Sequence, residues 1–557
     1  MNKLLIKYQT LAVFIIYVII FCILTWPLVI NISDYIYAVS GDPQATLYGF
    51  YQSITNPVKY LSPEPALFNL LGSWSSKLFG EVATYNILLL LGFTTTALAG
   101  YILGKFIIKN NYAAFWLGLV LGVSPFLTIQ SINHLNFVFL GPLLIFIYLL
   151  IRMSKDFEIK SFIFLSITFV ITSLLNYQYG FFAIIIGFFY FIYLLIFHIK
   201  QINGNFFFGI MIFILISLGS LLPFNTSLLD DMRERQIGNE TNNFSVRNKE
   251  ELKTYSAQWL YYFLPNPQNL LFGNSSEEKY QNLVDKLGTN FAEQTIYLGW
   301  INISLAALLI VWLRKYLSDL NKKITILFLI LLFGSFYFSF APNINIFGLK
   351  ITTPANYIFD LIPFFRVYAR LGVVVFISLV TLSAIAFSYL MEKYPQRKWL
   401  IVFIIYAFSL VEIYSFSSQY LLPASQKFMP KVYKQIIDYN NVKLAEYPLL
   451  TADDPNSYEY LFWQRIHKKD IIFGGNKNSP EESFRQKVIN PAQIETINQL
   501  KNMNVGYLII HTKKYLMENP EKHPFEYNDG KIPKIDTDKL NLELIGNYDG
   551  DLLYRIK

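Results

Sequence analysis

A single aspartate near the N-terminus is the residue best placed to do chemistry. Asp42 lies in Ser-Gly-Asp-Pro at 40–43, where a glycine before it and a proline after it favour a tight backbone turn. A carboxylate that is held in such a turn and partly shielded from water can act as a general base, or can hold a divalent cation against a phosphate. The same residues also suit a turn with no catalytic role, and the sequence leaves both interpretations open.

Two arginines precede a late apolar segment. Arg366 and Arg370 lie four residues apart, just before the apolar run that begins at Leu371. If a helix begins early, both guanidinium groups lie on one of its faces. Arginine binds phosphate oxygens in a bidentate way, so the pair predicts a phosphate site at a membrane boundary. The alternative is that both side chains only extend from a helix end toward the lipid headgroups.

A histidine and several acidic residues are further candidates. His134 comes at the end of a turn that starts at Ser124, and we expect it to open the next helix. There it either orients a leaving phosphate or a metal-bound group, or it only caps the helix. A second carboxylate that pairs with Asp42 is expected among the acids before the tail, and the spacing does not choose among them. They are Asp34, Glu64, Glu81, Asp230, Asp231, Glu234, Glu293 and Asp360.

The composition indicates which elements must position these residues. Of the 557 residues, 54% are apolar, 17% aromatic and only 15% charged, and the mean hydropathy is +0.37. A soluble domain carries about 25% charged residues, so a soluble enzyme, a disordered scaffold and a disulfide-rich module are excluded. The net charge of +8 does not indicate nucleic-acid binding, because the excess cations lie mainly in short connections between apolar runs. The single cysteine, Cys22, allows neither an intrachain disulfide nor a thiolate metal site.

Long apolar runs predict a polytopic α-helical membrane protein with about eleven transmembrane helices, since about 20 residues cross a bilayer. The runs lie near 11–30, 84–107, 112–129, 135–152, 161–177, 180–198, 205–224, 295–313, 324–341, 371–391 and 399–416. Lysine and arginine gather in alternate connections, which places the N-terminus in the cytoplasm and, with an odd number of spans, the C-terminus outside. The long segments 32–83 and 225–294 then lie on the outer side.

The chain divides into a membrane domain, residues 1–416, and an extracytoplasmic tail, residues 417–557. Short β-rich runs in the tail predict a small α/β domain, with helical spacing over 484–503 and a hairpin at Asn-Tyr-Asp-Gly, 547–550. The predicted strands are 442–450, 470–473, 505–511, 542–545 and 552–556. The tail either covers the site or recognises a glycan or acceptor, in which case Trp463 and His467 are its best surface candidates.

Several motifs are missing from the sequence. It has no Gly-Lys-Ser/Thr phosphate loop, no dinucleotide fingerprint, no Gly-x-Ser-x-Gly elbow and no His-Glu-x-x-His motif. We therefore expect no nucleotide cofactor, and an ATP-driven pump is disfavoured. Charged residues inside the predicted spans are nearly absent, apart from Glu412 near the end of the last one, which argues against an ion-coupled transporter.

Together these features resemble the multi-spanning bacterial membrane glycosyltransferases of the GT-C superfamily, the group loosely related to the protein mannosyltransferases and the aminoarabinose transferase. In the membrane domain the resemblance rests on Thr25-Trp-Pro-Leu28, Gly-Asp-Pro at 41–43, Thr84-Tyr-Asn86, Ala113-Ala-Phe115, Ser124-Pro-Phe126 with His134, Asn-Tyr-Gln-Tyr-Gly at 176–180, and Phe-Arg…Ala-Arg-Leu-Gly at 365–372. The tail resembles the extracytoplasmic domain of many members at Tyr460–His467, Gly474-Gly475 and Gly506–His511.

The resemblance implies a multi-pass protein of the bacterial cytoplasmic membrane that transfers a hexose or pentose at the outer face. The donor is a polyprenyl-phosphate-linked sugar, the acceptor is a glycan, lipid or protein, and a single displacement inverts the anomeric carbon. Asp42 is then the catalytic base or metal ligand, and Arg366 and Arg370 bind the donor phosphate with Mg²⁺ or Mn²⁺. Many relatives have a second acid where this chain has Asn133 and His134. The alternatives are a transporter, flippase or accessory protein for lipid-linked glycan precursors, and an inactive relative that binds glycans.

Overall fold

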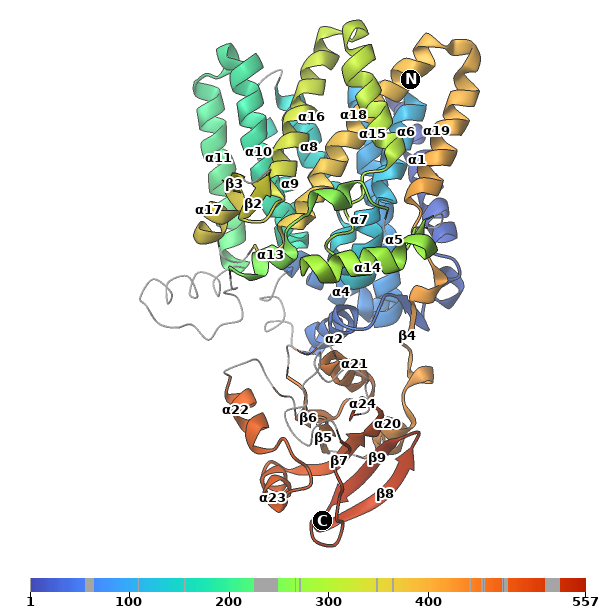
Figure 1. Ribbon diagram of the computed structural model, residues 1–557, viewed down its shortest axis with the longest axis vertical. Helices are drawn as coiled ribbons and strands as arrows, with labels where there is room; N and C mark the ends of the chain where they lie inside the picture. The colour runs from blue at the N-terminus through green and yellow to red at the C-terminus, as the bar shows by residue number, and fades with distance from the viewer. Residues whose placement is uncertain are drawn as a thin grey trace.

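The computed structural model describes most of the chain as one helical bundle with a small mixed α/β domain at one end (Figure 1). The described residues are 2–55, 65–108, 110–154, 157–224, 249–265, 267–269, 272–346, 349–362, 365–439, 442–451, 454, 456–472, 474, 479–515 and 531–557. The N-terminus lies at the far end of the bundle, and the C-terminus lies in the small domain.

Every predicted apolar segment contains helix. The helices of the bundle are α1 (Asn2–Leu24), α5 (Glu81–Ile108), α6 (Asn111–Gly122), α7 (Pro125–Asn133), α8 (Gly141–Met153), α9 (Ile159–Leu175), α10 (Tyr177–Phe197), α11 (Gly204–Leu221), α15 (Trp300–Leu308), the π-helical η6 (Leu309–Leu313), α16 (Asp319–Phe338), α18 (Gly372–Lys393) and α19 (Lys398–Ile413). Within the described residues, 7 helical segments are long and apolar enough to cross a membrane, which confirms the polytopic helical class. The number of spans and their orientation stay predictions.

Helix α18 forms the centre of the bundle. All residues from Gly372 to Ser388 are buried, and a helix that is apolar and buried on every side marks the core rather than a lipid-facing position. It packs against α6, α15 and α16. Helices α5 and α6 approach each other closely: a Cβ on Gly118 would lie only 2.3 Å from the carbonyl oxygen of Ala97. Small residues therefore allow this contact.

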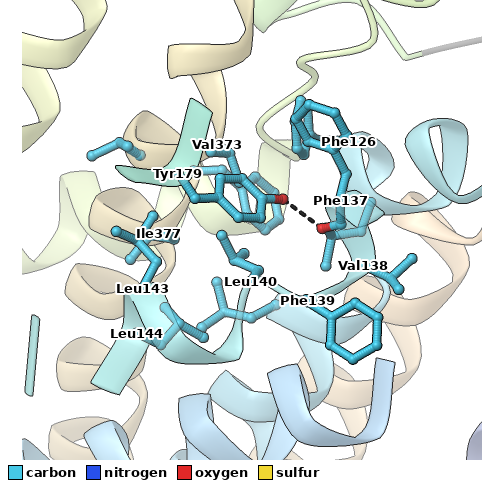
Figure 2. Close-up of a cluster of buried hydrophobic side chains, with 14 of the residues drawn as sticks. Phe126, Phe137, Val138, Phe139, Leu140, Leu143, Leu144, Tyr179, Val373 and Ile377 are labelled. Carbon is cyan, nitrogen blue, oxygen red and sulfur yellow. Dashed lines mark hydrogen bonds between the residues drawn. The ribbon is translucent and has the colours of Figure 1, made fainter. Parts of the chain in front are cut away.

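A buried cluster joins the core to the segment that follows α7. Phe126, Phe137, Leu140, Tyr179 and Val373 come from four different parts of the chain and pack together (Figure 2). The Tyr179 hydroxyl donates a hydrogen bond of 2.5 Å to the backbone oxygen of Phe137. Phe137 belongs to the short 3₁₀ helix η2 (Leu135–Val138), so this bond holds the backbone directly after His134.

The segment that starts at Ser124 differs from the expectation. We expected an outer turn, but the chain forms the buried helix α7 (Pro125–Asn133), which follows α6 after a break at Val123. Ser124 caps the new helix by accepting a hydrogen bond from the amide of Leu127, and Pro125 occupies its first turn. Proline suits this position because its missing N–H would have no helical partner there.

Shorter elements cover the end of the bundle that faces the C-terminal domain. They are β1 (Tyr35–Tyr37), α2 (Asp42–Thr55), α4 (Ala66–Phe79), α13 (Glu251–Tyr255), α14 (Gly273–Leu287), β2 (Asn343–Ile346), β3 (Leu349–Thr352) and α17 (Pro354–Leu361). Strand β1 pairs in antiparallel register with β4 (Leu421–Pro423), which lies just after the last bundle helix. In Figure 1, α2 lies between the bundle and the C-terminal domain.

The C-terminal domain has a five-stranded sheet with the order β6-β5-β7-β9-β8. The strands are β5 (Lys443–Tyr447), β6 (Asp470–Ile472), β7 (Val505–His511), β8 (Leu542–Tyr548) and β9 (Asp551–Ile556). The helices are α20 (Lys431–Ile436), α21 (Ser457–His467), α22 (Pro480–Lys487), α23 (Ile494–Asn502) and α24 (Thr512–Tyr515). The predicted small α/β domain is therefore confirmed.

Three predictions for the tail have clear outcomes. The hairpin between β8 and β9 is present, with Asp549 and Gly550 at φ values of 60° and 102°. The helical spacing over 484–503 corresponds to two helices, the end of α22 and the whole of α23, because Pro491 lies between them and cannot continue a helix. The choice of Trp463 and His467 as surface residues is wrong: they are 6% and 1% exposed, since both lie on the packed side of α21.

Glu412, the acidic residue noted in the last predicted span, has a structural role. Its carboxylate accepts hydrogen bonds from the Tyr297 hydroxyl at 2.6 Å and from the amides of Trp300 and Ile301 at 2.6 and 3.0 Å. These two amides are the first of α15, so the carboxylate caps a helix N-terminus that favours negative charge. Glu412 is therefore part of helix packing rather than of an ion path.

Candidate active site

The Gly-Asp-Pro motif starts a helix rather than forming a simple turn. Asp42 is the first residue of α2, and Pro43 lies in the first turn. Gly41 has a φ of 118°, a conformation that glycine adopts without strain. Its amide donates a hydrogen bond of 3.0 Å to the side chain of Gln44, which satisfies a donor at the helix start. The backbone on both sides of Asp42 is thus constrained.

A buried asparagine fixes the chain that leads to Asp42. Asn86 of α5 donates hydrogen bonds to the backbone oxygens of Ile32 and Tyr35, at 2.8 and 2.6 Å. The amide of Val39 then donates a 3.0 Å bond to the backbone oxygen of Ile132 in α7. Sequence reasoning assigned no role to Asn86, although an amide side chain in an apolar helix was the available signal, because such a group needs a partner when it is buried.

Asp42 and His134 form a direct pair. Asp42 Oδ2 lies 3.1 Å from His134 Nδ1, and the two side chains are 50% and 30% exposed. His134 ends α7 and, as expected, directly precedes the next helical turn, η2; its amide donates a 2.6 Å hydrogen bond to the backbone oxygen of Gln130. The pair is therefore held on both sides by helix ends and remains open to solvent.

Burial alone raises the pKa of Asp42, but three effects outweigh it. The hydrogen bond with His134, the charge of His134 and the charge of Arg370 together lower the pKa below its ordinary value of 3.8. The carboxylate is consequently ionised at neutral pH. An ionised and solvent-accessible carboxylate with a fixed imidazole beside it can accept a proton from a bound hydroxyl group.

A buried ion pair lies next to this dyad. The guanidinium of Arg370 binds both oxygens of Glu293, and its Nε lies 2.7 Å from Oε2. The side chains are 9% and 5% exposed. Gln130, one helical turn before His134, donates a 3.3 Å bond to Glu293. The ring of Phe137 contacts both sites, since it lies 4.5 Å from the Arg370 guanidinium and 5.8 Å from the His134 ring.

Arg366 and Arg370 would share a helical face only if the helix began before both of them, and it does not. The α-helix begins only at Gly372, after the single 3₁₀ turn η8 (Tyr368–Leu371), and Arg366 precedes both. Arg366 instead forms an ion pair with Glu251 and lies 4.5 Å above the Tyr255 ring. The spacing of four residues therefore does not place the two side chains on one helical face, and each arginine pairs with a different carboxylate.

Some of the other acidic candidates lie outside the part of the chain that the structure describes. Glu64, Asp230, Asp231 and Glu234 lie outside the described residues. Glu293 is the only predicted second acid linked to the dyad among the residues that the structure describes, and Arg370 neutralises it. No group of three His, Cys, Asp or Glu side chains able to hold a metal occurs in the described part of the chain. Since Mg²⁺ prefers several oxygen ligands, Asp42 and His134 do not by themselves form such a site.

An apolar groove lies between three helices of the bundle. It has a volume of about 420 Å³ and lies between α5, α8 and α9. The lining residues are Thr95, Leu98, Ala99, Ile102, Phe139, Gly141, Pro142, Ile145, Thr168, Ile171 and Leu175. Phe139 comes directly after η2, so one end of the groove approaches the backbone that carries His134.

The C-terminal domain contacts the elements that carry the site. Helix α21 packs against α2, and Arg465 of α21 forms a 3.1 Å ion pair with Glu81, the first residue of α5. Arg465 is buried and also donates to the backbone oxygen of Ala424. The domain therefore contacts both the helix of Asp42 and the helix of Asn86.

Replacing Arg465 with alanine is expected to destabilise the protein by about 1–3 kcal/mol, less than a fully buried pair would cost, because Glu81 keeps access to water. Hydrogen exchange should increase in α2. The measurement is peptide-level exchange in detergent with a denaturant titration, and Arg485→Ala is the control because Arg485 pairs with Glu482 inside α22. Unchanged exchange in α2 would show that the domain does not hold this helix.

Comparisons with known proteins identify the fold. No model of a protein family and no curated protein matches the chain. ArnT from Cupriavidus metallidurans bound to undecaprenyl phosphate superimposes with a TM-score of 0.53 and 10% identity, over 100% of this chain and 98% of that one. The oligosaccharyltransferase of Archaeoglobus fulgidus tethered to an acceptor peptide gives 0.50 and 13%, over 94% and 71%. Both are GT-C membrane glycosyltransferases, and the chain shares their fold, as predicted.

Proposed function

We propose that this chain is an integral membrane glycosyltransferase that transfers a hexose or pentose from a polyprenyl-phosphate-linked donor to a glycan, lipid or protein acceptor. The observation that carries the proposal is the 3.1 Å pair of Asp42 and His134, which is half open to solvent at the end of a GT-C bundle. A transporter has no need of an ionised carboxylate that is fixed by a second side chain at this position.

Asp42 acts as the general base in the proposed reaction. His134 holds one carboxylate oxygen, and the other accepts the proton of the acceptor hydroxyl. The acceptor oxygen then forms a bond to the anomeric carbon while the bond from that carbon to the phosphate oxygen breaks. The electron pair of the broken bond leaves with the polyprenyl phosphate, and a single displacement of this kind inverts the anomeric carbon.

The departing phosphate needs positive charge. Arg366 and Arg370 are proposed to supply it, although each has a carboxylate partner. Each arginine must therefore bind the phosphate through N–H groups that the carboxylate does not use, or exchange its partner when the donor binds. Mg²⁺ or Mn²⁺ remains a prediction, and no step above depends on it.

The groove between α5, α8 and α9 is proposed to hold the first part of the prenyl chain. Its lining is almost wholly apolar and its volume of about 420 Å³ lies within the range of ligand clefts, about 300–1,000 Å³. A lipid-linked donor stays in the bilayer, so a phosphate site needs an adjacent hydrocarbon path. ArnT, which shares the fold, has been crystallised bound to undecaprenyl phosphate, and this supports the same class of donor here.

The proposed location is the bacterial cytoplasmic membrane, with the C-terminal domain outside the cytoplasm. Lys105, Arg152, Lys315 and Lys393 lie at helix ends away from that domain. Since short cytoplasmic connections collect lysine and arginine, this end faces the cytoplasm and the dyad faces outward.

The experiment is an assay of the purified protein with a panel of radiolabelled polyprenyl-phosphate sugars and mixed envelope acceptors. Transfer of label, with release of polyprenyl phosphate and an inverted linkage by NMR, is the expected result. Movement of lipid-linked precursors across proteoliposomes without any transfer would instead favour a transporter.

A further inference from the structure

A second pocket lies between the same three helices, α5, α8 and α9, at the end of the bundle away from the dyad. Its volume is about 310 Å³. The lining residues are Phe106, Leu149, Arg152, Glu158, Lys160, Ser161 and Phe164. No residue of this pocket takes part in the proposed sugar transfer.

The polar half of the pocket carries a positive charge. Arg152 lies in the last turn of α8 and is exposed, and Lys160 lies in the first turn of α9. Glu158 pairs with Lys160 at 2.8 Å, but this pair is itself exposed, so an anion can compete for the lysine. Because two cations and one acid line this half of the pocket, its net charge is positive and favours an anionic ligand.

The other half of the pocket is apolar and partly exposed. Phe106 and Leu149 line it, and the Phe164 ring is 59% exposed. A free phosphate or a soluble metabolite gains nothing from such a wall. A ligand with an anionic group and a hydrocarbon part uses both halves.

The pocket and the apolar groove lie along one seam between the same helices. Phe106 follows Ile102 by one helical turn in α5, and Leu149 follows Ile145 by one turn in α8. In α9, Phe164 precedes Thr168 by the same interval. The apolar wall of the pocket therefore ends about one helical turn from the groove, which leaves the groove free for the prenyl chain.

We propose that this pocket binds the headgroup of an anionic phospholipid, with its phosphate between Arg152 and Lys160 and the start of an acyl chain against Phe106, Leu149 and Phe164. Basic pockets between helices at a cytoplasmic boundary bind anionic lipids in this way. The placement in the cytoplasmic leaflet rests on the orientation proposed above, whereas the binding itself does not rest on the proposed enzymatic activity.

The test uses the full-length protein in a neutral detergent. Phosphatidylglycerol is expected to stay bound in native mass spectrometry and to raise the melting temperature more than phosphatidylcholine or inorganic phosphate. The double variant Arg152→Ala/Lys160→Ala should lose at least about tenfold in apparent affinity, since each cation contributes about 1 kcal/mol to anionic lipid binding. Ser161→Asp, which adds an acid to the pocket, should have the same effect.

The control is Lys322→Ala/Lys323→Ala, which removes two cations from α16 at the same end of the bundle. If this control loses as much affinity for phosphatidylglycerol, binding depends only on the general positive charge of that end of the bundle. If phosphatidylcholine raises the melting temperature equally, binding depends only on hydrophobic contact. The proposal would also be overturned if inorganic phosphate stabilised the protein as much as phosphatidylglycerol does. The same holds if equimolar polyprenyl phosphate displaced the bound phosphatidylglycerol. All variants should give the wild-type elution volume, and none of these measurements uses sugar transfer as its readout.

Discussion

Replacing Asp42 with asparagine is expected to lower the rate of sugar transfer by about 10²–10⁴-fold, the range for loss of a general base. Asparagine has nearly the same shape and can still accept a hydrogen bond from His134 Nδ1, which lies 3.1 Å from the native carboxylate. It cannot take up the proton of an acceptor hydroxyl. The measurement is the single-turnover rate with labelled donor, and the melting temperature should stay close to that of the wild type.

The matched control is Asp360→Asn, because Asp360 is an exposed acid that pairs with Lys249 away from the dyad. This variant should transfer sugar at the wild-type rate. Full activity of Asp42→Asn, or equal losses in both variants, would remove Asp42 from the mechanism.

The pH profile gives a second readout on the same carboxylate. Its pKa lies below 3.8, because the hydrogen bond and the charges of His134 and Arg370 outweigh burial. The wild-type rate should therefore persist as pH falls, until it passes the lowered pKa. In the variant His134→Gln the charge next to Asp42 is lost, so burial raises the pKa of Asp42 with less opposition. The acidic limb of the pH profile should therefore move to higher pH. An unmoved limb would show that Asp42 is not the titrating base.

Replacing Arg370 with alanine is expected to destabilise the protein by about 3–5 kcal/mol, the usual cost of leaving one partner of a buried ion pair alone. Glu293 is 5% exposed, and among the described side chains it would keep the hydrogen bond from Gln130 as a polar contact. The measurement is the free energy of unfolding in detergent, followed by tryptophan fluorescence.

The double variant Arg370→Leu/Glu293→Leu should recover most of this loss, since it leaves no unpaired charge and costs only the hydrogen bond that Gln130 donates to Glu293. Arg366→Ala is the comparison for a more open pair, because Arg366 and Glu251 are 26% and 34% exposed, and it should cost about 0–1 kcal/mol. If the single and double variants are equally unstable, the loss comes from packing against Phe137 rather than from an uncompensated charge.

The role of the Arg370–Glu293 pair in transfer can be separated from its role in stability. If the double variant folds but its KM for donor rises, Arg370 contacts the donor phosphate. If its KM stays the same and the acidic limb of the pH profile moves upward, Arg370 acts only through the charge that it presents to Asp42.

The local elements could be predicted from the sequence because each depends on a short repeating pattern. An apolar run of about 20 residues has few alternatives to a helix, since every backbone group must find its partner inside the segment. The hairpin at 547–550 follows from residues that adopt positive φ. Even the GT-C fold was recognisable, because motifs such as Gly-Asp-Pro at 41–43 have a fixed order along the chain.

The pairs that make up the site were decided by the tertiary structure. His134 could be named as a candidate from the sequence, but its contact with Asp42 depends on α7 ending beside α2. In the same way, Glu293 was one of several equivalent acids until packing placed it against Arg370. Periodicity determines the conformation of a segment, whereas contacts between distant segments depend on how whole helices pack. The sequence therefore determined the helices and the fold, whereas the packing of the helices decided which charged side chains form pairs.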